Sequence, residues 1–213
     1  MGALRALGAA LLELALPSVC PACDAPRAAR EPVLCARCAA GVRPLARLRA
    51  VHTAIAYEGV GLELVRRFKF DGRHDARAVL AARLTARVAE LRFDAIVPIP
   101  RHLVRVRSEG RDPVFELARL LARATGAALL DRVLARARPT PPQTGLTIAA
   151  RRTNVAGSFT ARPHALAGRR VLLVDDVATT GATLAEAART LRRESGAKRI
   201  TLAAVAGTPA SVL

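Results

Sequence analysis

The stretch Val171-Leu172-Leu173-Val174-Asp175-Asp176-Val177-Ala178-Thr179-Thr180-Gly181-Ala182-Thr183 decides the expected fold. Its first four residues are all apolar, which is typical of a short strand in the middle of a parallel sheet. Two carboxylates stand where this strand is expected to end, and a Thr-Thr-Gly turn then opens a helix expected over 181–194. Parallel sheets bind ligands beyond the carboxyl ends of their strands, so this junction is the candidate site.

The two halves of this junction favour different chemical groups. The amino end of the helix favours an anion, because its free N–H groups and its dipole point toward the preceding turn. Gly181 lets a ligand approach the backbone closely. The carboxylates of Asp175 and Asp176 suit vicinal hydroxyls, directly or through Mg²⁺. A ribose with a 5-phosphate fits both halves, whereas a simple helix cap would explain one aspartate but not the pair.

Strands and helices alternate along the rest of the chain. Strands are expected over 52–58, 94–100 and 200–206, and helices over 62–70 and 74–91. A further helix should start at Asp112 and Pro113, a favourable cap and first residue, and end at Gly126. This order predicts an α/β fold with a mostly parallel sheet, flanking helices and right-handed crossovers.

All four cysteines lie in two CxxC pairs near the N-terminus. The pairs are separated by eleven residues, and the ligand set that they offer a tetrahedral zinc ion is Cys20, Cys23, Cys35 and Cys38. Two disulfides or a redox CxxC are the alternatives. A cytoplasmic protein rarely keeps disulfides, and a redox site needs one pair only. The pattern therefore favours a structural zinc ribbon that depends on its metal for folding.

Length and hydropathy suggest one domain with a small appendage. The chain has 213 residues, of which 52% are hydrophobic, so it can bury a core. An N-terminal helix and the zinc ribbon are expected over 1–43, and 41–49 reads as a linker. The apolar stretch 4–16 carries Glu13 and is too short to span a bilayer, so we expect a packed helix, no membrane span and a cytoplasmic location.

The chain is strongly basic, with a net charge of +17. Two of its 34 basic residues are lysines and the others are arginines. The charge is compatible with an anionic partner such as nucleic acid or a phosphorylated metabolite. A general compositional bias toward arginine explains it equally well. Aromatic residues make up 3% of the chain, so stacking platforms for single strands are scarce.

Residues 171–183 resemble the motif with which type I phosphoribosyltransferases bind PRPP (5-phosphoribosyl 1-diphosphate). The resemblance implies that Asp175 and Asp176 hold the ribose hydroxyls and are the candidate catalytic residues. It also implies that the 5-phosphate is held by a set of turn residues, namely Ala178, Thr179, Thr180, Gly181 and Thr183. In such a site Mg²⁺ accompanies PRPP.

A zinc ribbon ahead of such a domain resembles the ComF family of competence-associated proteins, and the similarity spans nearly the whole chain. It implies a phosphoribosyltransferase-like domain over 50–213 and a segment over 136–155 that closes on bound PRPP. The residues that it places on the pyrophosphate side are Lys69, Pro98, Pro100, Arg101, Arg151 and Arg152. One departure stands out, because Glu109 replaces an arginine of the family pattern.

Three functions are compatible with these features. The first is transfer of phosphoribose from PRPP to an unknown acceptor, or hydrolysis of PRPP. The second is a non-catalytic factor that associates with single-stranded DNA and the DNA-uptake machinery, with the domain as a PRPP-responsive scaffold. The third is a regulator that binds PRPP and changes its partners. The departure at Glu109 weakens the case for turnover more than the case for binding.

Overall fold

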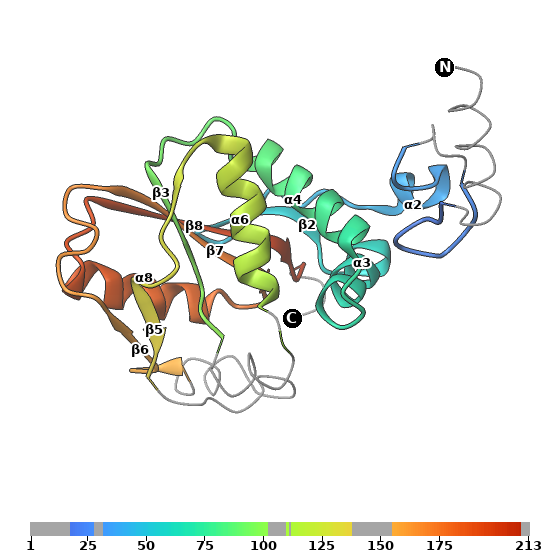
Figure 1. Ribbon diagram of the computed structural model, residues 1–213. Coiled ribbons are helices and arrows are strands. Elements are labelled where there is room, and N and C mark those ends of the chain that lie inside the picture. The colour runs from blue at the N-terminus through green and yellow to red at the C-terminus, as the bar shows by residue number, and fades with distance from the viewer. Residues whose placement is uncertain (1–17, 28–31, 102–109, 111, 138–154, 210–213) are drawn as a thin grey trace, which may run out of the picture.

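A six-stranded sheet forms the centre of the molecule in the computed structural model (Figure 1). The structure describes residues 18–27, 32–101, 110, 112–137 and 155–209. The strands of the sheet, in spatial order, are β1 (Arg47–Leu48), β2 (Val51–Ala56), β8 (Arg199–Gly207), β7 (Arg170–Ala178), β3 (Ala95–Pro98) and β4 (Ala128–Leu129). A separate ribbon pairs β5 (Leu134–Arg136) with β6 (Phe159–Ala161). The helices are α2 (Ala36–Gly41), α3 (Gly59–Lys69), α4 (His74–Val88), α6 (Pro113–Thr125) and α8 (Ala182–Glu194).

The sheet is parallel apart from its first strand. β2, β8, β7, β3 and β4 pair in parallel, and β1 is antiparallel to β2. The helices lie on both faces of the sheet, as right-handed crossovers require. The predicted α/β fold with a mostly parallel sheet and flanking helices is confirmed.

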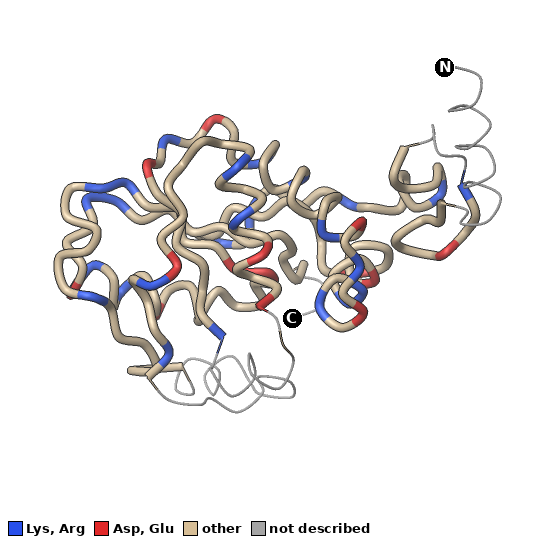
Figure 2. Tube along the Cα trace, viewed as in Figure 1, with Lys and Arg blue, Asp and Glu red and all other residues tan. Residues whose placement is uncertain are grey.

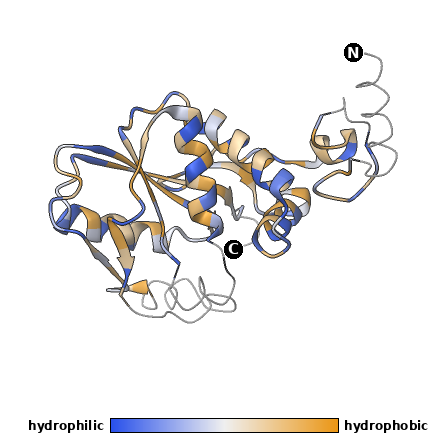
Figure 3. Ribbon diagram, viewed as in Figure 1, coloured by the Kyte–Doolittle hydropathy of each residue, from blue (hydrophilic) through white to orange (hydrophobic). Residues whose placement is uncertain are grey.

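Two hydrophobic clusters cover the two faces of the sheet. One joins α3, α4 and α6 to the sheet through Leu64, Leu80 and Leu117. The other joins α8 and the β5–β6 ribbon to the opposite face through Leu184 and Phe159. Hydrophobic residues accordingly concentrate along the sheet and on the inner sides of the helices (Figure 3). The central strand β7 contributes to both clusters, so its position is fixed from both sides.

The helix α6 begins and ends where the sequence predicts. Asp112 caps it by accepting hydrogen bonds from the N–H groups of Val114 and Phe115 at 3.0 and 3.2 Å. Pro113 is its first residue, and Gly126 ends it in the left-handed conformation with φ of 73°. These local signals suffice because each one satisfies a backbone group that a helix end leaves free.

The structure differs from the sequence-based expectation in two places. β7 extends to Ala178, so Asp175 and Asp176 lie within the strand and not beyond its end. Pairing with β8 continues as far as Ala178 and keeps the backbone extended past the apolar run. The expected linker over 41–49 contains β1, which pairs with β2 and extends the sheet at its edge.

The expected helix over 4–16 lies outside the described residues. Within the described part of the chain, every helix is too short or too polar to cross a bilayer.

Candidate functional site

The acidic pair lies where β7 has a partner on one side only. β3 accompanies β7 as far as the pair Pro98–Val174, and the N–H of Ile99 still donates to the carbonyl of Val174 at 2.8 Å. The chain then leaves the sheet at Pro100, since proline has no N–H to continue the ladder. β8 stays paired to β7 for the next residues. The departure of β3 therefore leaves one side of β7 without a strand at Asp175 and Asp176.

Lys69 lies directly against the acidic pair. It is the last residue of α3, and its Nζ lies 2.8 Å from Oδ2 of Asp176. Both side chains are mostly buried, with 21% and 11% of their surface exposed, so water screens the pair weakly. Burial alone would lower the pKa of Lys69, but the charge and hydrogen bond of Asp176 and the charge of Asp175 raise it. Lys69 is therefore a fixed cation at the acidic pair.

The surroundings of Asp175 disfavour its ionised form. Burial and the neighbouring charge of Asp176 raise its pKa to about 7, against the lowering effect of Lys69. The N–H of Asp176 donates to Oδ1 of Asp175 at 2.8 Å, and the charge of Arg136 also favours the ionised form. A ligand that supplies hydroxyl donors or positive charge would stabilise the negative charges of these two neighbouring carboxylates.

The turn after β7 offers an open helix terminus. Gly181 precedes α8 with φ of 76°, a left-handed conformation that glycine adopts readily. It has no side chain to cap the helix, whereas the Thr180 hydroxyl accepts a hydrogen bond from the N–H of Ala182 at 3.3 Å. Ala178 and Thr180 are buried, and Thr179 and Thr183 are half-buried. The predicted phosphate-holding residues thus surround the amino end of a helix of 13 residues.

The residues predicted on the pyrophosphate side separate into four groups. Pro98 and Pro100 lie beside the acidic pair, where β3 leaves the sheet. Arg101 lies at the start of α6, where its positive charge and backbone N–H act to lower the pKa of Asp112. Burial of that carboxylate outweighs them, so its pKa is raised. Lys69 approaches from the α3 side of the sheet, as described above. The residues that lie outside the described part of the chain are Arg151, Arg152 and Glu109.

Sequence reasoning missed three residues near this site. Arg136 ends β5, and its Nε donates to the carbonyl of Pro100 at 3.4 Å while its guanidinium stacks 4.9 Å from the ring centre of Phe159. Tyr57 follows β2 and contributes to the electrostatic environment of Lys69. Thr208 follows β8, and its buried hydroxyl has no hydrogen-bond partner among the described residues. The ends of predicted strands were a usable signal for Tyr57 and Thr208, whereas β5 was not expected at all.

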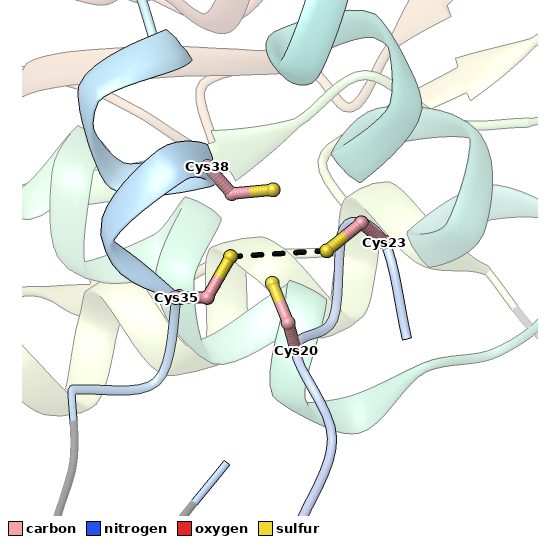
Figure 4. A group of neighbouring side chains, drawn as sticks. All are labelled: Cys20, Cys23, Cys35 and Cys38. Atoms are coloured by element: carbon pink, nitrogen blue, oxygen red, sulfur yellow. Dashed lines mark hydrogen bonds between the residues drawn. The ribbon is translucent and has the colours of Figure 1, made fainter. Parts of the chain in front are cut away.

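The four cysteines converge on one point, as Figure 4 shows. Their sulfur atoms all lie within 4.8 Å of one another, and Sγ of Cys23 and Cys35 are 3.8 Å apart. A disulfide requires about 2.05 Å, so these thiols are free. Four ligands at about 2.3 Å from a tetrahedral zinc ion would be separated by about 3.8 Å. The cluster is therefore consistent with zinc binding and has the dimensions of a closed four-sulfur site.

The surroundings of the cysteines favour thiolates unequally. Burial would raise the pKa of Cys20, but N–H groups of Cys35, Ala22 and Cys23 donate to it and lower its pKa to about 6. Burial and the neighbouring thiols raise the pKa of Cys38 to about 12. The guanidinium of Arg37 bonds to Cys23. Four adjacent thiols cannot all ionise without a cation between them, and a divalent metal supplies that charge.

Comparison with known proteins identifies the family to which the chain is similar. The model of the phosphoribosyl transferase domain matches residues 80–213. Competence protein F of Haemophilus influenzae is 34% identical over 139 residues, which cover 61% of this chain and 61% of that protein. DNA utilization protein YhgH of Salmonella typhimurium is 32% identical over 187 residues, which cover 84% of this chain and 80% of that protein.

Solved phosphoribosyltransferase structures are similar at low identity. The PRPP amidotransferase of B. subtilis shares 21% identity with a TM-score of 0.45, over 67% of this chain and 30% of that chain. The purine phosphoribosyltransferase of Pyrococcus horikoshii shares 21% identity with a TM-score of 0.38, over 62% of this chain and 74% of that chain. The domain match covers more than half of the sequence, and the YhgH alignment covers four fifths of both proteins. The chain therefore belongs to the phosphoribosyltransferase domain family and, within it, to the ComF family that includes competence protein F and YhgH.

Proposed function

We propose that the protein binds PRPP together with Mg²⁺ at the end of β7 and transfers its phosphoribosyl group to an acceptor. The observation that carries this proposal is the position of Asp175 and Asp176 beside the amino end of α8. The carboxylates suit the ribose hydroxyls, and the amino end of α8, with its N–H groups and its helix dipole, suits the 5-phosphate. The family match supports the same ligand class.

The charges of the site fit the reaction. When the bond between ribose C1 and pyrophosphate breaks, the leaving pyrophosphate takes the bonding electrons and the sugar becomes positive. Asp175 and Asp176 would stabilise the sugar, because preorganised charges lower the barrier where charge develops. Arg101 directly follows Pro100, and Arg136 donates to the carbonyl of Pro100, so both guanidinium groups are suited to the pyrophosphate. Bound Mg²⁺ would add positive charge to the pyrophosphate oxygens. Arg151 and Arg152, which lie outside the described residues, remain proposed contacts of the pyrophosphate.

The N-terminal cysteine cluster has a structural part in this proposal. We propose that residues 1–43 form a helix and zinc ribbon, and residues 50–213 the phosphoribosyltransferase-like domain. Four thiolates leave zinc no open coordination position, so the metal would stabilise and not catalyse. Free thiols in this arrangement fit a reducing compartment, and we propose that the protein works in the cytoplasm.

Calorimetric titration with Mg²⁺ and PRPP tests the ligand assignment. The wild-type protein should bind, and the Asp175→Asn/Asp176→Asn variant should lose at least a hundredfold in affinity, since two hydroxyl-binding carboxylates are removed at once. Asp131→Asn, an exposed aspartate far along the chain from β7, is the matched control. Equal binding by the double variant and the control would refute the assignment. If the wild type binds, pyrophosphate release with candidate acceptors then tests turnover.

A second function is favoured by a basic surface at the amino ends of β7 and β8. Segments 162–170 and 192–199 lie side by side, because Gly168 N–H donates to Gly196 O at 3.2 Å and Lys198 N–H to Arg169 O at 2.9 Å. This basic ridge consists of six exposed side chains, Arg162, Arg169, Arg192, Arg193, Lys198 and Arg199. Figure 2 shows basic residues gathered at this end of the molecule, away from the cysteines.

The ridge has little neutralising charge of its own. Arg193 pairs with Glu194 at 2.6 Å, and Asp94 is already bound by Arg170 at 2.5 Å. Arg170 and Arg199 stand directly opposite each other in the sheet, an arrangement of like charges that costs stability. We propose that this ridge holds the phosphate backbone of single-stranded DNA. Relatives named for competence and DNA utilization support this partner.

A charge-matched pair of variants tests the ridge. Arg169→Glu/Lys198→Glu changes two phosphate-binding side chains from positive to negative. The variant should bind a fluorescent single-stranded oligonucleotide at least tenfold more weakly, and its affinity should depend less steeply on salt. Arg119→Glu/Arg123→Glu changes the net charge equally but lies on exposed positions of α6. An equal loss in both variants would show that net charge, and not the ridge, carries the binding.

A further inference from the structure

The cysteine cluster is connected to the α3–α4 turn by one carboxylate. Asp24 directly follows Cys23 and has φ of 56°, a left-handed conformation that is uncommon outside glycine and that aspartate tolerates better than most residues. Its N–H donates to Cys20 O at 2.9 Å, within the loop that carries the first two cysteines. Its two carboxylate oxygens accept hydrogen bonds from Arg67 at 2.5 Å and from Arg73 at 2.8 Å.

These two arginines bracket Lys69. Arg67 lies in the last turn of α3 and Arg73 immediately before α4. Their backbones are also linked, since Arg73 N–H donates to Arg67 O at 3.3 Å. Asp24 therefore clamps both ends of the turn from which Lys69 extends to Asp176.

Packing reinforces the connection. Cys20 and Cys38 belong to the same hydrophobic cluster as Leu64 and Phe68 of α3. Phe68 is 2% exposed and directly precedes Lys69. A movement of the cysteine loop is therefore transmitted to α3 through packed side chains. Packed cores move between discrete arrangements rather than deforming gradually.

We propose that Asp24 is a positioning residue that couples the metal state of the cysteine cluster to the phosphoribose site through Arg67, Arg73 and Lys69. With zinc bound, the loop holds the Asp24 carboxylate against both arginines, and Lys69 stays in place on Asp176. Without zinc, the loop loses its constraint, the clamp opens, and the acidic pair loses its fixed cation. The inference rests on the proposed function, because it concerns affinity for PRPP.

Two variants test the coupling in the zinc-loaded protein. Asp24→Asn removes the charge that ties the two arginines to the cysteine loop, while Arg67 keeps its pair with Glu63 and Arg73 its pair with Asp75. Asp71→Asn, exposed in the same turn, is the matched control. Asp24→Asn should retain one zinc per chain but bind Mg²⁺ and PRPP about tenfold more weakly, within the usual range of coupling between sites. Asp24→Glu, which keeps the charge, should recover part of the loss. Behaviour of Asp24→Asn identical to that of the control would overturn the proposal.

Hydrogen exchange separates this inference from the ligand assignment. The amides of Phe70, Asp71 and Arg73 donate to carbonyls of Arg66 and Arg67, so they report on the clamped turn. They should exchange at least tenfold faster in Asp24→Asn and after zinc removal, while the amides of α8 stay unchanged. This result does not need PRPP, so a wild-type protein that fails to bind PRPP refutes the proposed function and leaves the coupling testable. Unchanged exchange in both cases would contradict the coupling.

Coupling between two sites is reciprocal, which gives a test in the wild-type protein. If zinc strengthens PRPP binding, Mg²⁺ and PRPP must strengthen zinc binding by the same factor. The zinc affinity, measured by equilibrium competition with a chromogenic chelator, should therefore rise severalfold in saturating PRPP with Mg²⁺, relative to Mg²⁺ alone. Equal zinc affinity under both conditions, in a protein that binds PRPP, would contradict the coupling.

Discussion

Asp175→Asn should make the protein more stable than the wild type at pH 8, although it removes a proposed ligand contact. The gain should be on the order of 2–4 kcal/mol, because each unit of pKa shift corresponds to about 1.4 kcal/mol. Such a trade-off is expected where a fold keeps two adjacent carboxylates together for a ligand and not for its own stability.

The sign follows from the raised pKa of Asp175. In the unfolded chain an aspartate loses its proton near pH 3.9, but in the folded protein burial and Asp176 raise the pKa of Asp175 to about 7. Between these values the folded state holds a proton that the unfolded state has released. The stability of the wild type therefore falls as the pH rises from about 4 to about 7 and stays low above that range. Asparagine cannot ionise, so the variant lacks this loss.

Urea unfolding between pH 5 and pH 8, without Mg²⁺ or PRPP, provides the measurement. The free energies of unfolding of wild type and Asp175→Asn should diverge as the pH rises. The free energy of unfolding of Asp131→Asn should change with pH as that of the wild type does, because that side chain is exposed on a turn. A gap between wild type and Asp175→Asn that does not depend on pH would show that Asp175 is not held at a raised pKa.

The local parts of the fold could be predicted because their signals are local. Asp112, Pro113 and Gly126 each satisfy a backbone requirement of α6 without help from distant residues. The apolar run of β7 and the motif that follows it indicated the sheet and the site for the same reason. The two CxxC pairs predicted a cluster, and the structure brings all four sulfur atoms together.

The resemblance placed Lys69 at the site, but its ion pair with Asp176 and the presence of Arg136 could not be predicted, because they depend on tertiary packing. The sequence places Lys69 and Asp176 more than a hundred residues apart, and their contact follows from the way α3 packs beside the end of β7. Arg136 lies on a strand of three residues with no periodic pattern to reveal it. The length of β7 was also misjudged, since pairing with β8, and not its own apolar run, determines where the strand ends.

Removing zinc should lower the melting temperature by about 10 °C. Structural zinc sites contribute about 10–16 kcal/mol of binding free energy in isolated zinc fingers. Here we expect a loss of about 3 kcal/mol for the whole chain, and each kcal/mol corresponds to about 2–4 °C at this size. The loss is limited because the cluster on the α8 face of the sheet contains no residue of the cysteine region. The cluster on the other face contains Cys20, Leu34 and Cys38, so its edge should unfold first.

Cys38→Ser tests whether this stability comes from the bound metal or from the packing of the cysteine side chains. Cys38 is 3% exposed, and serine in its place offers zinc a far weaker ligand. The variant should lose its zinc, as measured by elemental analysis, and melt like the chelator-treated wild type. Ser18→Ala, next to the loop that carries Cys20 and Cys23, should keep both zinc and melting temperature. If Cys38→Ser melted normally without metal, the cysteines would contribute only packing. A zinc-dependent edge next to α3 is also what the proposed role of Asp24 requires, because a clamp can report on the metal only if the loop that carries it depends on the metal.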